Sequence, residues 1–433
     1  MNVGIIGAGT MGLTFAHRLG EAGARVTVLE GAPQVGGLAT WFDYGDFVWD
    51  KYYHVILRSD SHLLGLIGEL GLASRMRWTA TRTGFLWRGR HLSMSNHWEF
   101  LTFPALSLWD KARLAAGILR AQRINDPAPL EKITAVEWLQ RLFGRRVYEA
   151  IWAPLLESKY GALADQTPAT IMWATIRRYY STRGKGGGQE TLGSLTGGLR
   201  SFFDALTQAV EEKGGVIRRG EPVVALDDSN PGKVVVATPR SRFEFDRVIS
   251  TLPTALLRKA APGLRGMYEG DGRDPRFLGV VCLALALRRP LSPYYITNLI
   301  QRGFPFTGVI EVSNLTGVEE LNGRRLVMLP RYDVPESPWF ERDAGEIAEE
   351  FLAQLRAIWP DIGDNLVRWF VHRARRVQAL WIDAPPPLPQ PRHTPDGRVW
   401  SVNAEIAGRD TLNNNAIVRV ANDAAEAFLK DIS

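Results

Sequence analysis

The first thirty residues combine two short apolar runs with one stretch of helical hydrophobic spacing. Residues 3–6 and 25–29 have the apolar, alternating character of short strands. Between them, residues 14–20 repeat their apolar side chains at the period of one helical face, continuing from Leu13 through Ala16 and Leu19. The pattern predicts a βαβ unit at the start of the chain.

The next 140 residues change character twice. Residues 40–60 look extended and aromatic, whereas from about 60 to 180 the apolar positions mostly follow the helical period. The glycines of residues 183–198 then interrupt the pattern and predict a mobile connection back to the first unit. The helical stripes are Leu63, Leu64, Ile67 and Leu70; Leu114, Ile118 and Ala121; and Val136, Leu139 and Leu142.

The second half of the chain alternates short apolar runs with a few helical stretches. Runs near 278–287, 309–312 and 326–329 alternate in polarity and predict an antiparallel sheet. The other expected strands are 216–226, 233–238, 243–250 and 399–402. The expected helices are 202–210, 347–358 and 416–429. Residues 385–395 form a proline-rich crossing.

Composition narrows the class of protein. The 433 residues carry a net charge of +6 and are 45% hydrophobic, which is typical of a globular chain. The single cysteine, Cys282, excludes an internal disulfide framework and a cysteine-based zinc site, and it favours the reducing cytoplasm. No apolar run approaches the roughly 20 residues of a membrane span, and no basic stripe or motif predicts nucleic-acid binding. The histidine spacings predict no metal site.

The turn after the first apolar run matches G-x-G-x-x-G at residues 7–12. In this position Gly7 permits the tight turn, Gly9 lets backbone approach a pyrophosphate, and Gly12 lets the helix pack against the strand. The helix N-terminus supplies unpaired N–H groups to the phosphates. Glu30 ends the second strand, where an acid binds ribose hydroxyls. The spacing therefore predicts a dinucleotide site.

A second glycine pair, Gly36-Gly37, follows Glu30 too closely for a plain NAD fingerprint. With the first motif it resembles the FAD-dependent amine oxidase, protoporphyrinogen oxidase and phytoene desaturase superfamily, in which this pair lies beside the FAD diphosphate. Residues 45–54, ending in Lys51-Tyr52-Tyr53-His54, resemble the family's strand under the isoalloxazine and echo UDP-galactopyranose mutase. Segments at 138–161 and 305–332 resemble the bacterial protoporphyrinogen oxidase-like branch.

The resemblance implies an α/β fold: a Rossmann-like FAD-binding domain of the GR2 type with an inserted antiparallel-sheet plus helical substrate domain. The implied domains are residues 1–58, 190–265 and 385–433 for FAD, 59–189 for a helical substrate or lid region, and 266–384 for the antiparallel sheet. The implied cofactor contacts are Gly7, Ala8, Gly9, Thr10, Met11, Gly12, Glu30, Gly31, Gln34, Gly36, Gly37, Leu38, Val223, Val224, Thr251, Asn403, Asn414, Asn415 and Ala416.

The candidate catalytic residues are Lys51, Tyr52, His54, Arg331 and Tyr332, and Lys159 and Tyr160 are further pocket candidates. Each also has a structural interpretation, as an ion-pair partner, a core aromatic or a satisfied histidine. Flavin chemistry needs few protein groups, because the cofactor's N5 accepts or donates the hydride. No second glycine motif predicts an NAD(P)H domain, so we expect oxygen, a quinone or another acceptor to take the electrons.

Three functions remain open at this stage. The first is an FAD-dependent oxidoreductase that dehydrogenates or desaturates an apolar or amine-bearing small molecule. The second is a non-redox flavoenzyme resembling UDP-galactopyranose mutase, favoured by Lys51-Tyr52 and by Gly408-Arg409-Asp410. The third is a flavin-bearing scaffold that has lost catalysis. The sequence predicts neither the substrate nor the oligomeric state.

One stretch raises the question of membrane contact. Residues 100–109 are largely apolar and precede a helical stretch that carries Lys111, Arg113, Arg120 and Arg123. An apolar segment beside a basic helix suits the surface of a membrane. The alternative is a substrate-domain helix packed on its neighbours. The expected location is the cytoplasm, with peripheral contact at the inner membrane face as the hypothesis to test.

Overall fold

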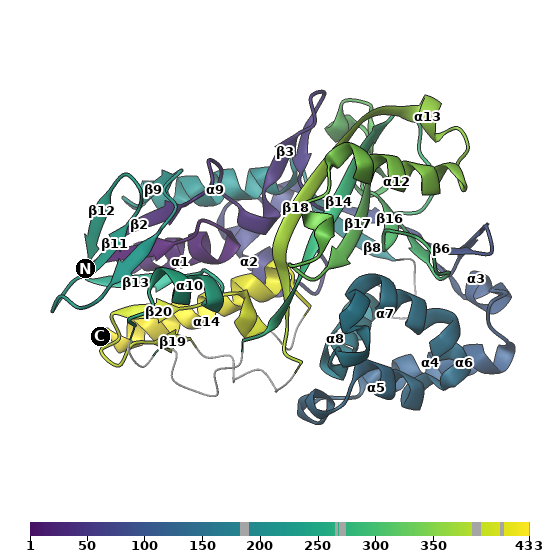
Figure 1. Ribbon diagram of the computed structural model, residues 1–433, viewed down its shortest axis with the longest axis horizontal. Coiled ribbons are helices and arrows are strands. Elements are labelled where there is room, and N and C mark those ends of the chain that lie inside the picture. Colours follow the sequence, from purple (N-terminus) through teal and green to yellow (C-terminus); the bar gives the residue numbers. More distant parts are fainter. Residues whose placement is uncertain (182–189, 265–266, 268–273, 383–390, 408–410, 433) are drawn as a thin grey trace.

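The computed structural model describes residues 1–181, 190–264, 267, 274–382, 391–407 and 411–432. Two large sheets lie next to each other, and a group of helices packs beside the second of them (Figure 1). Both chain termini lie at the outer end of the first sheet (Figure 1). The protein is therefore of the α/β class, as predicted.

The first thirty residues form the predicted βαβ unit. β1 (Asn2–Ile6) and β2 (Arg25–Glu30) pair in parallel, and α1 (Thr10–Glu21) connects them. The three apolar side chains that define its predicted face are all buried. This unit is the centre of a six-stranded sheet with the order β19-β20-β13-β1-β2-β9.

A different group of elements packs on each face of the six-stranded sheet. Helices α1, α9 (Gly198–Glu212) and α14 (Asn414–Asp431) build one hydrophobic core, and a three-stranded sheet with α10 (Thr254–Ala260) builds the other. The expected strands are confirmed, except that 216–226 and 243–250 each contain two. Their bounds are β9 Val216–Arg219, β10 Ala225–Asp227, β11 Val234–Ala237, β12 Arg242–Phe245, β13 Arg247–Ser250, β19 Arg392–His393 and β20 Val399–Ser401.

The second large sheet has seven strands in the order β18-β14-β17-β16-β15-β6-β7. Its long strands β14 (Arg276–Leu287), β17 (Arg325–Asp333) and β18 (Leu366–Leu380) pair antiparallel, which confirms the predicted antiparallel sheet. Helix α12 (Ala344–Arg356) packs on one face, and the hairpin of β3 (Trp41–Asp43) and β4 (Val48–Asp50) packs on the other. The remaining bounds are β15 Ile296–Leu299, β16 Gly308–Glu311, β6 Thr83–Trp87, β7 Arg90–Ser93, α11 Ser313–Thr316 and α13 Ile362–Asn365.

Helices gather between residues 97 and 181, as the stripes predicted, and share one core. The prediction that residues 60–180 are mostly helical is nevertheless wrong for 76–93, which form β5 (Met76–Ala80), β6 and β7. The predicted helical region 59–189 therefore contains strands, two of which join the seven-stranded sheet. The helices are α2 Ser61–Glu69, α3 His97–Thr102, α4 Leu108–Gln122, α5 Ala135–Phe143, α6 Arg145–Val147, α7 Ala153–Tyr160 and α8 Ala169–Ser181.

The predicted mobile connection at 183–198 is also partly wrong. Residues 191–195 form β8 (Thr191–Leu195), which pairs antiparallel with β5. Residues 182–189, which include the start of this connection, and residues 383–390, which include the start of the proline-rich crossing, lie outside the described residues. Among the helices in the described part of the chain, none combines the length and hydrophobicity needed to cross a bilayer.

Candidate functional site

The loop from β1 to α1 is shaped by its glycines. Gly7 has φ +101°, a backbone conformation that is strained for any residue with a side chain. A Cβ built on Gly12 would lie 1.9 Å from the carbonyl oxygen of Gly7, so the first turn of α1 packs directly on the loop. Gly9 is the N-cap of α1 and offers no capping side chain. The first N–H groups of α1 are therefore presented without a side-chain cap, as anion binding requires.

The second glycine pair closes against this loop. The Gly36 N–H donates to the Ala8 carbonyl at 2.9 Å, and Gly36 forms a β-bridge with Gly9. Gly36 and Gly37 have φ values of +107° and +57°. A Cβ built on Gly9 would meet only the Cα of Gly37, at 3.9 Å. The two glycine motifs thus line one cradle.

Glu30 is held at the end of β2 by two backbone groups. Its Oε2 accepts from the Ala8 N–H and its Oε1 from the Ala32 N–H, both at 2.7 Å. The carboxylate is thereby fixed beside the cradle. Gln34 is turned into its own loop, because its Nε2 donates to Thr40 Oγ1 at 2.6 Å and to the Trp41 carbonyl at 3.0 Å.

The C-terminal segment meets the cradle at the start of α14. Asn414 Oδ1 accepts from Thr10 Oγ1 at 3.0 Å, which docks the beginning of α14 on the beginning of α1. Asn415 Oδ1 accepts from the backbone N–H groups of His62 and Leu63, so this side chain caps α2. Three helix N-termini therefore converge at this place, and Figure 1 shows α1, α2 and α14 side by side.

The remaining predicted cofactor residues have varied surroundings. Thr251 Oγ1 donates to the Ile6 carbonyl at 2.8 Å, and Asn403 Nδ2 donates to the Leu252 carbonyl at 3.0 Å. Both side chains therefore hold strand ends of the six-stranded sheet. Leu38 and Val224 are exposed, and Gly31 packs on Pro222.

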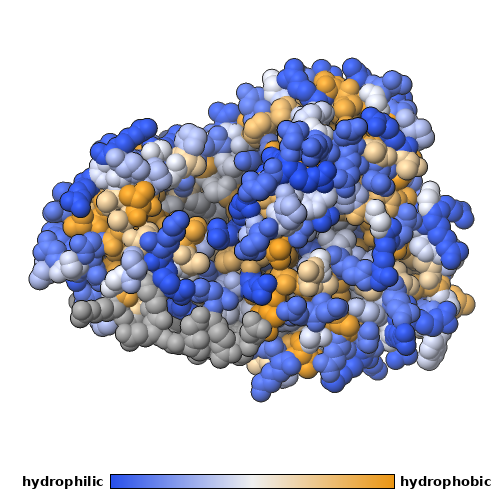
Figure 2. Space-filling model, viewed as in Figure 1, coloured by the Kyte–Doolittle hydropathy of each residue, from blue (hydrophilic) through white to orange (hydrophobic). Residues whose placement is uncertain are grey.

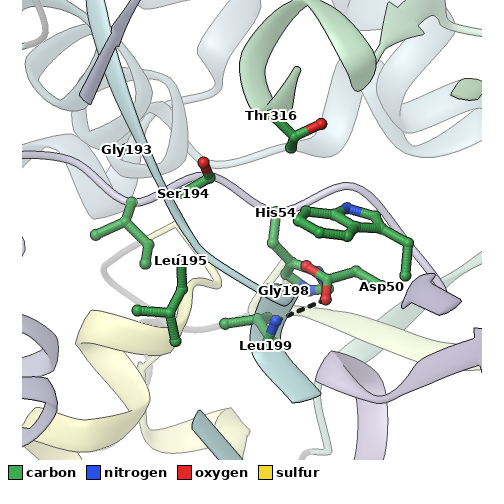
Figure 3. A pocket seen from close by; sticks show the side chains of 10 residues that line it. Asp50, His54, Gly193, Ser194, Leu195, Gly198, Leu199 and Thr316 are labelled. Carbon is green, nitrogen blue, oxygen red and sulfur yellow. Dashed lines mark hydrogen bonds and ion pairs between the residues drawn. The ribbon is translucent and has the colours of Figure 1, made fainter. Parts of the chain in front are cut away.

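A small pocket beside β4 brings Asp50 and His54 together (Figure 3). Asp50 Oδ1 accepts from the Leu199 N–H at 2.8 Å and so binds the N-terminus of α9. Asp50 Oδ2 lies 3.8 Å from Nδ1 of His54, which has no hydrogen-bond partner among the described residues. Burial raises the pKa of Asp50 to about 7 and lowers that of His54 to about 4. Near neutral pH the imidazole is thus uncharged, and the carboxyl is present in both its protonated and its ionised form.

A second group, which we call the phenol pair, joins three parts of the fold. Tyr53 Oη and Tyr332 Oη are 2.5 Å apart, one in the loop after β4 and the other on β17. The Lys159 ammonium, on α7, lies 3.4 Å from the centre of the Tyr332 ring. Burial raises the pKa of Tyr53, so its hydroxyl is neutral. Tyr160, the neighbour of Lys159, is buried in the helical core.

Lys51 and Tyr52 precede Tyr53 in the same loop after β4. Burial lowers the pKa of Lys51 and raises that of Tyr52, whose hydroxyl is buried without a partner among the described residues. Burial and the Lys51 charge lower the pKa of His372, on β18, to about 3. Neutral His372 and Tyr52 therefore face each other, with ring centroids 6.1 Å apart.

The structure separates Arg331 from Tyr332. Adjacent residues of a strand face opposite sides of the sheet, and Tyr332 belongs to the core with the β3–β4 hairpin. Arg331 instead donates to the Pro305 carbonyl and to Asp333, and its guanidinium stacks 4.3 Å from the Trp339 ring. The geometry therefore does not place Arg331 with the other candidates, and it adds three residues absent from the candidate set: Asp50, Tyr53 and His372.

Comparison with known proteins decides the family. The sequence profile of the family described as flavin containing amine oxidoreductase matches residues 12–381, which is most of the chain. The chain belongs to this family. It is thus an FAD-dependent oxidoreductase of the amine oxidase superfamily, and the cofactor prediction, FAD, is confirmed.

Individual relatives of this amine oxidoreductase are distant. The 15-cis-phytoene desaturase of Glycine max is 21% identical over 392 residues, covering 83% of this chain and 66% of the soybean protein. An oxidoreductase from Methanosarcina mazei has the same fold, with a TM-score of 0.73, 20% identity and coverage of 98% and 99% of the two chains. Reduced UDP-galactopyranose mutase matches with a TM-score of 0.71, 16% identity and coverage of 100% and 94%.

The cradle residues of this amine oxidoreductase fit FAD. The uncapped start of α1 and the glycines around it leave backbone N–H groups and space for a diphosphate. The fixed Glu30 carboxylate is a suitable acceptor for ribose hydroxyls. We keep Asn414 and Ala416, at the α14 N-terminus, as proposed flavin contacts. The Gln34 and Asn415 side chains serve their own loop and α2.

The Asp50–His54 pair predicts a defined pH dependence of stability. Because the folded pKa of His54 is about 4 and an unfolded histidine titrates near 6.5, the unfolded chain binds a proton below pH 6.5 that the folded chain does not. The stability that His54 contributes is therefore lost as the pH falls from 6.5 towards 4, whereas the raised pKa of Asp50 acts in the opposite direction in the wild type and the variant alike. We expect His54→Gln to lose less stability between pH 7 and 5 than the wild type, by about 2 kcal/mol.

Urea unfolding of both proteins at several pH values measures this difference. His62→Gln is the matched control, because His62 is partly exposed on α2 and its side chain has no hydrogen bond to the described part of the chain. Parallel pH profiles for wild type and His54→Gln would show that His54 is an ordinary solvated histidine.

Proposed function

We propose that this enzyme dehydrogenates or desaturates a neutral, largely apolar small molecule. FAD supplies the chemistry when bound, since its N5 accepts the hydride. The observation that supports this proposal is the phenol pair beside the Lys159 ammonium. We take the two phenols and the ammonium as part of the proposed substrate wall, which would favour a neutral substrate and disfavour an alkylammonium, because like charges repel. The amine-bearing alternative is thereby less favoured.

The protein groups have limited and distinct tasks in this proposal. Tyr52, Tyr332 and His54 are proposed to contact the substrate, with Tyr53 orienting the Tyr332 hydroxyl. Burial, together with the Lys51 charge, keeps His372 uncharged beside Tyr52. Asp50 holds the N-terminus of α9 against the pocket. Arg331 is proposed to position β17 and to take no part in substrate contact.

The relatives support a lipophilic substrate without naming it. The soybean relative is a phytoene desaturase, and this chain spans about two thirds of its length. The mutase alternative gains no specific support: residues 408–410, on which it partly rested, lie outside the described residues, and the likeness to reduced UDP-galactopyranose mutase concerns the fold.

Anaerobic mixing of the oxidised holoenzyme with candidate substrates tests the proposal. Loss of the oxidised flavin absorbance with neutral apolar compounds supports dehydrogenation. Absence of bleaching by any neutral compound, with UDP-sugar binding only after dithionite reduction, would instead assign the enzyme to the mutase class.

A charge substitution tests the substrate class separately. We expect Lys159→Met to bind alkylamine analogues about tenfold more tightly than the wild type, because it removes the repelling ammonium. Lys159→Arg keeps the charge and should behave like the wild type. Titration of the flavin spectrum with an alkylamine measures these affinities, and equal affinities in all three proteins would remove Lys159 from the pocket wall.

A further inference from the structure

The most exposed large hydrophobic side chains of the described chain are clustered on α3 and α4. Trp98 is 79% exposed, Trp109 75% and Leu108 73%, all within twelve residues. Leu101 and Leu119, at 50% and 47%, extend the cluster. We call these five residues the α3–α4 patch. Contiguous exposure of large apolar side chains is unusual for a protein surface and marks an interaction site.

The fold holds the α3–α4 patch outward. Between the exposed residues, Phe103 and Leu106 are buried in the helical core and anchor the turn from α3 to α4. Lys111 is buried as well, and its ammonium donates to the Leu101 carbonyl at 2.6 Å, which ties α4 to the end of α3. Lys111 is therefore a structural residue of this turn, although the sequence grouped it with the surface arginines.

The exposed charges of α4 itself have one sign, whereas α3 carries Glu99, which is paired with Arg82, and Asp126 follows α4. Arg113, Arg120 and Arg123 are exposed along and just after α4. The only acid of α4, Asp110, is buried and bonded to Ser107 in the capping box that starts the helix. The outer face of α4 thus combines large apolar side chains with arginines and carries no exposed carboxylate.

We propose that the α3–α4 patch docks this enzyme on the surface of an anionic lipid bilayer. Tryptophan and leucine side chains suit the boundary between headgroups and acyl chains, and the arginines suit lipid phosphates. A symmetric contact with a second copy of the chain would place like-charged arginines against each other. The charge pattern therefore favours lipid over self-association.

The position of the α3–α4 patch agrees with such docking. Figure 1 shows α3 and α4 at the end of the long axis opposite β2 and β12, so the FAD-binding sheet stays clear of the contact. Hydrophobic residues reach the surface of this helical region among hydrophilic ones (Figure 2). The proposal depends on this surface alone and does not rest on the proposed reaction.

Vesicle flotation with the full-length holoenzyme tests the docking. We expect binding to phosphatidylcholine vesicles that contain phosphatidylglycerol, weaker binding to pure phosphatidylcholine, and loss of binding at high salt. The double substitution Trp98→Ala and Trp109→Ala should lower the partition coefficient by about tenfold or more. Arg113→Gln with Arg120→Gln should remove the preference for anionic vesicles. Trp369→Ala, at an exposed tryptophan of β18, is the matched control and should bind like the wild type.

Three results would overturn the docking surface. The first is absence of wild-type binding to the anionic vesicles, and the second is undiminished binding by the double tryptophan variant. The third is concentration-dependent self-association that the same variant abolishes, measured by analytical ultracentrifugation, because it would assign the patch to a second copy. Anaerobic flavin bleaching without vesicles is independent of these outcomes, so a failure here is distinguishable from a failure of the proposed reaction.

Discussion

Gly12→Ala will yield no stably folded protein, whereas Gly9→Ala will yield a folded protein that has lost most of its affinity for FAD. At Gly12 the new Cβ would lie 1.9 Å from the Gly7 carbonyl oxygen, and neither backbone segment can move without separating α1 from β1. We expect a destabilisation of more than about 4 kcal/mol, a large share of the stability of an ordinary domain.

The Gly9→Ala variant tests FAD binding separately from folding. Its φ is −76°, and a Cβ there meets nothing closer than Gly37 Cα at 3.9 Å, so alanine fits the protein. The same Cβ would occupy the space through which a diphosphate approaches the start of α1. We expect the dissociation constant for FAD to rise by about 100-fold, equivalent to about 2.7 kcal/mol.

Urea unfolding of the apoprotein and titration with FAD separate the two effects. Gly65→Ala, in α2, is the control, because no atom lies within 4 Å of its Cβ and alanine favours a helix. It should keep wild-type FAD affinity. If Gly9→Ala also kept it, the proposed position of the diphosphate would be wrong.

The sequence predicts the cofactor unit better than the rest of the chain, for a physical reason. The βαβ unit is local: its strand, glycines, helix and acid lie within thirty residues, and each supports the others. β5 was missed because its partner, β8, lies more than a hundred residues further along the chain. Short apolar runs such as β6 do not distinguish strand from helix by periodicity alone.

The positions of single residues in the candidate site were also difficult to predict from the sequence, because they depend on the fold. Arg331 and Tyr332 are adjacent in sequence, yet the strand sends them to opposite faces of the sheet. Tyr53 was passed over between Tyr52 and His54, and only the fold brings it to Tyr332, which is 279 positions away. The sequence did contain one signal that Arg331 and Tyr332 point to opposite faces. If the predicted strand at 326–329 is extended by three residues, its alternation places them on different sides of the sheet.

The second large effect is expected where α8 meets the start of α2. Asp60 is 1% exposed, and its carboxylate receives two bonds from the Arg178 guanidinium of α8, at 2.6 and 3.0 Å. It also accepts from the Leu57 N–H at 2.8 Å. Arg178→Met leaves this carboxylate buried beside a single donor. We expect a loss of about 3–5 kcal/mol, because removing one partner of a buried pair leaves an uncompensated charge.

The comparison with an exposed pair makes this expectation specific. Arg145 pairs with Glu149 on the surface, with the arginine side chain 83% exposed, and Arg145→Met should leave the stability nearly unchanged. Adding Asp60→Asn to Arg178→Met removes the buried charge and should recover part of the loss. If urea unfolding gave equal, small losses for Arg178→Met and Arg145→Met, the Asp60 carboxylate would be solvated and the end of α8 loosely attached. A large loss confined to Arg178→Met would instead mean that one buried ion pair fixes α8 against the start of α2 and the end of the preceding loop.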